Sequence, residues 1–191
     1  QLNDVLRRKI SQKVFVTMAL TLWTEDTRTL TYANAGHPPV LYYDSATKKV
    51  IDVRLQGMAI GMLEDVEKLI KTQQFTIKPG DVFVMYSDGI VEANNPAKEQ
   101  FGLAKLKMVV QDAAIEDKPA EIIKNIILSN IIEHIAGSEY LDFLNINIHF
   151  QNLNKKLKRF CLVQLWKVTL IIFRINGELA KINGKIFLKN I

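Results

Sequence analysis

Residues 78–89, Lys-Pro-Gly-Asp-Val-Phe-Val-Met-Tyr-Ser-Asp-Gly, decide how the chain folds. Val82–Tyr86 is apolar at every position, which is typical of a strand buried on both faces. Pro79 and Gly80 stand at the two central positions of a type II turn just before it. We therefore predict a central strand that enters from a tight turn and ends close to the pair Asp88-Gly89.

The segments before this strand predict antiparallel hairpins, and those after it predict helices. Runs rich in β-formers, separated by polar turns, indicate strands at Val14–Trp23, Thr29–Ala33, Val40–Tyr43, Lys49–Val53 and Lys71–Ile77. Apolar residues at helical spacing indicate helices at Gln1–Gln12, Lys98–Gln111 and Ala120–Ile135, with a further strand at Leu144–Phe150. Strands followed by helices predict an α+β class.

Length and composition narrow the class of protein. The chain has 191 residues, of which 48% are hydrophobic and 24% charged. These are globular values for one domain or a piece of one, and they exclude a wholly disordered or fibrous chain. Cys161 is the single cysteine, which excludes an internal disulfide and a cysteine zinc cluster. No uncharged apolar run reaches about 18 residues, and the sequence from Gln1 onward does not open as a charged-then-apolar leader. We therefore expect a cytoplasmic protein whose true start lies upstream.

The net charge of +5 is unevenly distributed. Residues 1–142 hold 16 Lys and Arg against 19 Asp and Glu, whereas residues 143–191 hold 9 against one acid, Glu178. The domain is therefore predicted to occupy residues 1–142. Residues 143–191 form a basic tail of atypical composition, which is either an out-of-frame segment or a small β-extension. A basic tail also admits a nucleic-acid or anionic-membrane contact, although a solvated face is the simpler interpretation and no nucleic acid is expected.

Asp88 is the first candidate for chemistry. A carboxylate held at the end of a rigid strand suits hard cations such as Mg²⁺ and Mn²⁺, and Gly89 lets the backbone pass close to a ligand. Asp-Gly is also an ordinary turn pair. Asp142 is the second candidate, because it precedes an apolar segment and could complete a site from a neighbouring strand end. A solvated turn is the alternative for Asp142.

The loop Asn34–Pro39 is the third candidate region. Its two prolines fix φ and remove two donors, so neither a helix nor a central strand continues through it. His37 could contact phosphate or carry a proton, or its ring could satisfy loop backbone groups. Asn34 is interpreted as a side chain that shapes the loop, and Gly36 belongs to the same turn.

These elements together resemble a known family. The segments that carry the resemblance occur in order: Phe15–Met18, Tyr32–Pro39, Gly57–Gly61, Pro79–Asp81, Tyr86–Asn94, Phe101-Gly102 and Leu141-Asp142. Over about residues 1–142 the chain is similar to the SpoIIE-type branch of the PPM metal-dependent serine/threonine protein phosphatases of bacterial signalling. Asn-Ala-Gly-His-Pro-Pro and Ser-Asp-Gly-Ile-Val-Glu-Ala are specific in combination.

The resemblance implies a sandwich of two antiparallel sheets flanked by helices, incomplete at its N-terminus. It implies a two-metal centre of Mn²⁺ or Mg²⁺ that activates water, so that no covalent phosphoenzyme is needed. By motif, Asp88 and Asp142 are the metal ligands, with Asn34, Gly36, His37 and Gly89 shaping the site. The family's earlier acidic elements do not occur in this sequence, and Asp142 precedes Phe143 where the family has a second acid or Asn.

The function implied is hydrolysis of phosphoserine or phosphothreonine on a protein. The family's typical partners are anti-sigma-factor antagonists of STAS fold, and a sensor domain often precedes the phosphatase domain. The alternative is a non-catalytic binding module or decayed fragment, because half of the family's metal ligands are missing from the sequence. A site with half its ligands is not expected to hydrolyse a phosphate monoester, which needs acceleration of up to roughly 10²¹-fold.

Overall fold

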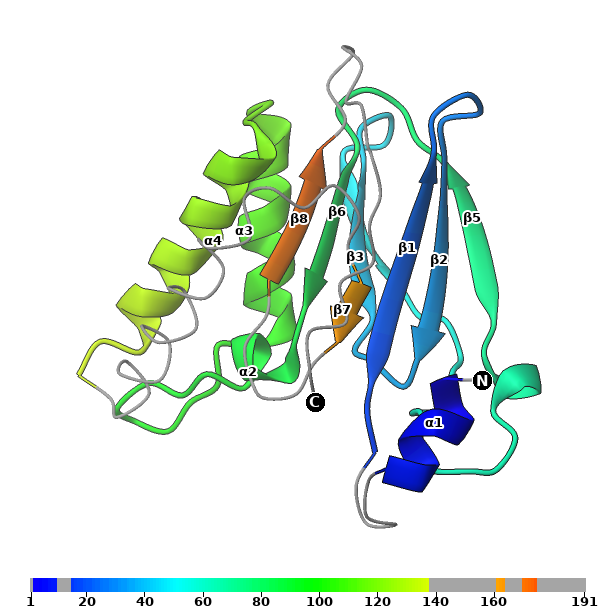
Figure 1. The fold of residues 1–191 in the computed structure, drawn as a ribbon. Helices are drawn as coiled ribbons and strands as arrows, with labels where there is room; N and C mark the ends of the chain where they lie inside the picture. The colour runs from blue at the N-terminus through cyan, green and yellow to red at the C-terminus, as the bar shows by residue number, and fades with distance from the viewer. Residues whose placement is uncertain (1, 10–14, 138–160, 164–169, 175–191) are drawn as a thin grey trace.

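The computed structural model describes residues 2–9, 15–137, 161–163 and 170–174, and its strands form two four-stranded antiparallel sheets (Figure 1). The first sheet has the order β5-β2-β1-β7 and the second β4-β3-β6-β8. The strands are β1 (Met18–Thr24), β2 (Thr29–Ala35), β3 (Val40–Asp44), β4 (Lys49–Val53), β5 (Thr72–Thr76), β6 (Val82–Tyr86), β7 (Cys161–Val163) and β8 (Leu170–Arg174). The helices are α1 (Leu2–Lys9), α2 (Asp88–Val91), α3 (Leu103–Ile115) and α4 (Ala120–His134), with a short 3-10 helix η1 (Glu67–Leu69).

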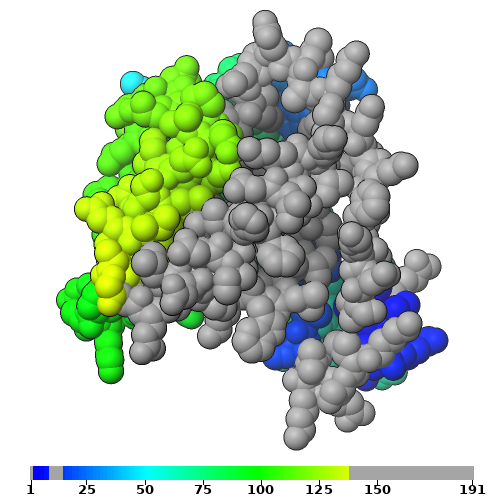
Figure 2. Space-filling model, turned by 60° about the vertical axis from the view of Figure 1, so that its left-hand side comes forward, coloured from blue at the N-terminus to red at the C-terminus, as the bar shows by residue number. Residues whose placement is uncertain are grey.

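The layers follow from the alternation of side chains along the strands. Leu30 and Tyr32 of the first sheet pack against Val40, Phe83 and Met85 of the second, and this contact is the core between the sheets. On its other face, the second sheet packs against the apolar sides of α3 and α4. Figure 2 shows these two helices, in green and yellow-green, forming one side of the molecular surface. The predicted α+β sandwich of two antiparallel sheets with flanking helices is confirmed.

The central strand β6 is buried on both faces, as its sequence predicts. No residue of β6 is more than 3% exposed. Val82, Val84 and Tyr86 face the helices, while Phe83 and Met85 face the other sheet. The turn before β6 is also as predicted, because Gly80 has a φ of +91°.

The start of α3 differs from the prediction. We expect a helix from Lys98, but α3 begins at Leu103. Lys98 has a φ of +65°, and the Phe101 N–H donates to the Ala93 carbonyl at 2.8 Å. The loop therefore turns back on itself, which buries the Phe101 ring in the core next to α3. Burial of this ring outweighs the local helical pattern.

Two short strands come from the predicted basic tail. β7 pairs with β1, and β8 pairs with β6. The predicted strand Leu144–Phe150 lies outside the described residues. Among the residues that the structure describes, no helix is both long enough and apolar enough to cross a membrane.

Candidate functional site

The Asn34 side chain holds the loop that follows β2. Its Nδ2 donates to the His37 carbonyl at 3.0 Å and to the Leu55 carbonyl at 3.1 Å, and its Oδ1 accepts the His37 N–H at 2.7 Å. Asn34 is 4% exposed, so these bonds form away from water. The interpretation of Asn34 as a loop-shaping side chain agrees with this geometry.

The segment after β4 passes very close to this loop, at two glycines. A Cβ on Gly57 would lie 1.8 Å from the Asn34 carbonyl oxygen, and a Cβ on Gly36 would lie 2.8 Å from the Ala59 nitrogen. Gly36 also has a φ of +73°. Only glycine allows the two backbones to approach this closely, and this approach fixes the position of the residue after Gly36.

His37 is that residue, and its ring is buried at 4% exposure. Its Nδ1 lies 3.4 Å from the Thr17 hydroxyl on the segment before β1. Burial lowers the pKa of His37 below its usual value, while the Tyr86 carbonyl and the Asp88 carboxylate act in the opposite direction. The ring is therefore uncharged at neutral pH, and His37 lies within electrostatic reach of Asp88.

Asp88 is the first residue of α2, two residues beyond the end of β6. Its Oδ1 accepts the N–H of Gly89 at 2.9 Å, and its side chain is exposed while Gly89 is buried. The sequence predicts a turn here, whereas the structure has the short helix α2. This helix holds the backbone of Asp88, and so the direction in which its carboxylate leaves the chain. The structure thus brings Asp88, Gly89, Asn34, Gly36 and His37 to the same end of the sandwich.

The described part of the chain offers one of the two predicted metal ligands. The exposed carboxylate of Asp88 is a hard oxygen donor and fits a divalent cation. Within residues 2–9, 15–137, 161–163 and 170–174, no three His, Cys, Asp or Glu side chains gather in a way that could hold a metal ion. Asp142 lies outside the described residues, so its place beside Asp88 stays a prediction. Asp88 therefore fits a metal as one ligand, and a complete cage needs further acids.

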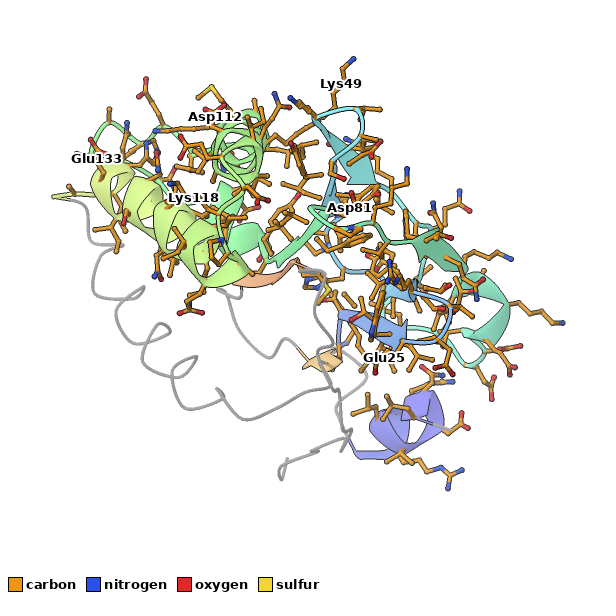
Figure 3. All side chains as sticks on the ribbon, turned by 90° about the horizontal axis from the view of Figure 1, so that it is seen from above. Glu25, Lys49, Asp81, Asp112, Lys118 and Glu133 are labelled. Atoms are coloured by element: carbon orange, nitrogen blue, oxygen red, sulfur yellow. The ribbon has the colours of Figure 1, made fainter. Side chains whose placement is uncertain are left out.

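Asp81 is a structural residue that the sequence presents only as part of a turn. Its carboxylate accepts the Lys78 N–H at 2.8 Å, the Ser45 N–H at 2.9 Å and the Tyr42 hydroxyl at 2.8 Å. It lies at the start of β6, near the β3–β4 turn, which leads into Lys49 at the start of β4 (Figure 3). Asp81 thus fastens the β3–β4 hairpin to the end of β6 away from Asp88.

Known proteins resemble this chain in sequence and in fold. A family model described as Stage II sporulation protein E (SpoIIE) matches residues 1–140. The phosphoserine phosphatase RsbU of Bacillus subtilis is 31% identical over 91 residues, which are 48% of this chain and 27% of RsbU. The chain thus spans about a quarter of the length of this relative.

Two solved structures share the fold. The SiaA-PP2C domain of Pseudomonas aeruginosa has a TM-score of 0.59 at 16% identity and covers 91% of this chain and 58% of its own. The PP2C phosphatase domain of SpoIIE from Bacillus subtilis, solved with a fragment of its regulatory domain, has a TM-score of 0.55 at 19% identity, covering 71% and 38%. The family model matches well over half of the chain, and the fold agrees with it. The chain therefore belongs to the SpoIIE family of PPM-type phosphatases.

Proposed function

We propose that this chain is part of the catalytic domain of a metal-dependent phosphatase that removes phosphate from phosphoserine or phosphothreonine of a protein. The observation that supports this most directly is Asp88, an exposed carboxylate just after the buried strand β6, whose charge acts on the buried His37 ring. The name of RsbU, phosphoserine phosphatase, supports the substrate class.

The residues of the chain have separate tasks in this proposal. Asp88 and Asp142 supply carboxylate oxygens for Mn²⁺ or Mg²⁺, together with acids from a longer chain. When bound, such a pair of cations supplies an activated water and neutralises charge on the phosphoryl oxygens. Asn34, Gly36 and Gly89 shape the backbone around the site, and the buried His37 ring, whose pKa burial lowers, adds no positive charge near Asp88 at neutral pH.

The setting proposed for this activity is bacterial signalling in the cytoplasm. The substrate would be a phosphoprotein, for which an anti-sigma-factor antagonist of STAS fold is the candidate, and a sensor domain would precede the phosphatase domain. The similarity to RsbU and to the SpoIIE family supports this setting.

Hydrolysis of p-nitrophenyl phosphate with Mn²⁺ tests the activity. A longer chain that restores the family's upstream acids should hydrolyse it, and Asp88→Asn in that chain should abolish turnover, because an amide is a far weaker ligand than a carboxylate for a hard cation. Equal turnover in the variant and the parent would refute the role of Asp88.

A matched control is Asp112→Asn, an acid on the exposed side of α3. This variant should keep full turnover. Loss of turnover in both variants would point to a general effect of removing negative charge rather than to a ligand.

The second candidate is a non-catalytic binding module built on the phosphatase scaffold. It is favoured by the lack, among the described residues, of a cluster of three potential metal ligands. In that case, calorimetry on the chain and on its longer form should show no Mn²⁺ binding tighter than the millimolar range, while a partner protein still binds. Tight Mn²⁺ binding by the longer form would exclude this candidate.

A further inference from the structure

Arg54 lies directly after β4, at the same end of the sandwich as Asp88. The register pairs Val53 of β4 with Val40 of β3, and Leu41 of β3 with Val84 of β6. The end of β4 and the end of β6 are therefore level with each other on either side of β3. Position 54 is thus level with the end of β6, two residues before Asp88.

A hydrogen bond ties Leu55, the residue after Arg54, to the loop that carries His37. The Leu55 carbonyl, one residue after Arg54, accepts from the Asn34 Nδ2, which also donates to the His37 carbonyl. The same side chain thus fixes the backbone beside Arg54 and the backbone that carries His37. The backbone from which the Arg54 side chain extends is therefore held to the loop of the candidate site.

The charges around Arg54 leave its guanidinium available to an anion. Its side chain is 73% exposed, and its Nη2 lies 3.5 Å from Asp52 Oδ2, at the outer limit of a hydrogen bond. Asp52 also forms an ion pair with Lys107 of α3, so two cations share one carboxylate and the group carries a net positive charge. The charges of Asp52 and Arg54 also act on the Tyr86 phenol. Burial, and then Asp52, raise the pKa of Tyr86 to about 12, while Arg54 lowers it.

We propose that Arg54 binds the phosphate group of the substrate at the Asp88 end of the sandwich. A guanidinium offers two parallel N–H donors whose geometry matches the oxygens of a phosphate. Recognition by Arg54 rests on the proposed phosphatase function, and it adds a substrate-binding residue that none of the sequence motifs contains. Arg54 would hold the anionic group that Asp88 and its partner ligands act on.

Inorganic phosphate is the probe for this proposal, with its binding to the full chain measured by calorimetry and by phosphorus NMR line width. Arg54→Gln should weaken phosphate binding about tenfold, the effect of losing one charge-assisted contact. Arg54→Lys should recover part of the affinity because it restores charge without the fork of donors. In the longer, active chain, Arg54→Gln should raise KM for p-nitrophenyl phosphate by more than it lowers kcat.

The matched control is Lys49→Gln, a cation at the opposite end of the same strand β4. It should leave phosphate affinity unchanged. Equal affinity in the Arg54→Gln and Lys49→Gln variants, or no phosphate binding by the parent chain, would overturn the proposal. Failure of the phosphatase function gives a different result: phosphate binding that depends on Arg54, without Mn²⁺-dependent turnover in the longer chain.

Discussion

Asn34 uses both ends of its side-chain amide to hold backbone groups that come from two parts of the chain. The two carbonyls and the one N–H that it satisfies lie at His37 and Leu55. Such buried polar groups are costly when they lose their partners. The shape of the loop at the candidate site therefore depends on this one side chain.

Asn34→Ala should lower the free energy of unfolding by about 2–3 kcal/mol, because it leaves buried backbone groups without partners. Urea unfolding followed by circular dichroism measures this difference. The control is Asn125→Ala on the exposed side of α4, which should change stability by less than about 0.5 kcal/mol. Similar small losses in both variants would show that Asn34 does not hold the loop.

At the residue scale, the sequence predicts which side chains are candidates for the site, but not the contacts that hold them in place. Asp88, His37 and Asn34 stand out because Asp-Gly after an apolar run and Gly-His-Pro-Pro in a loop are unusual local patterns. The contacts of His37 with Thr17 and of Asn34 with Leu55 join residues about 20 positions apart. No local pattern predicts such contacts, and Gly57 is recognisable as essential only once the Asn34 carbonyl is seen against it.

At the scale of elements, α3 is fixed to the second sheet by polar contacts as well as by its apolar face. Lys107 pairs with Asp52 of β4, and Gln111 Oε1 accepts the Val50 N–H at 3.4 Å. The Lys107 ammonium holds the pKa of Asp52 below its usual range, mainly by a hydrogen bond. A carboxyl whose pKa is lowered by folding adds stability above its unfolded pKa and loses that contribution as pH falls.

Lys107→Met should therefore cost about 1 kcal/mol of stability at pH 7, because a partly exposed ion pair is lost while the apolar stem is kept. The difference from the parent chain should shrink as pH falls below about 4, where the unfolded Asp52 carboxyl takes up a proton. Urea unfolding at a series of pH values measures this. A difference that stays constant down to pH 2 would assign the effect of Lys107 to packing instead.

The elements themselves were predictable where local pattern and burial agree. β4 and β6 have the predicted bounds, Lys49–Val53 and Val82–Tyr86, because their apolar residues match their faces in the sheet. The prediction that this helix starts at Lys98 was wrong, because Asn95 and Glu99 form a turn. In this turn the Asn95 Oδ1 accepts the Glu99 N–H at 2.8 Å. The short helix α2 was missed, since four residues carry no helical period.

At the scale of the whole molecule, β7 and β8 cover the sides of β1 and β6 that would otherwise be sheet edges. Both come from residues beyond the segment that the family model matches. An uncovered edge presents unpaired N–H and C=O groups that recruit other strands. Residues 143–191 supply the two strands that pair with these edges, so we expect this part of the chain to limit association through them.

A chain shortened to residues 1–142 should therefore self-associate, because it exposes the edges of β1 and β6. Sedimentation velocity at several concentrations measures this. A chain shortened to residues 1–174 keeps both strands and serves as the control, which should behave as the full chain does. If residues 1–142 sediment as a single species with the same association state as the full chain, β7 and β8 do not protect these edges.

The position of β6 also sets the order in which parts of the molecule open. A strand that is buried on both faces and hydrogen-bonded to a neighbour on each side exchanges its amide protons only through near-global opening, whereas peripheral segments open at much lower cost. Asp88 lies two residues beyond this strand. The carboxylate of the candidate site thus follows a strand that opens only with most of the fold, so local opening of α1 or of the loop before α3 should leave its position unchanged.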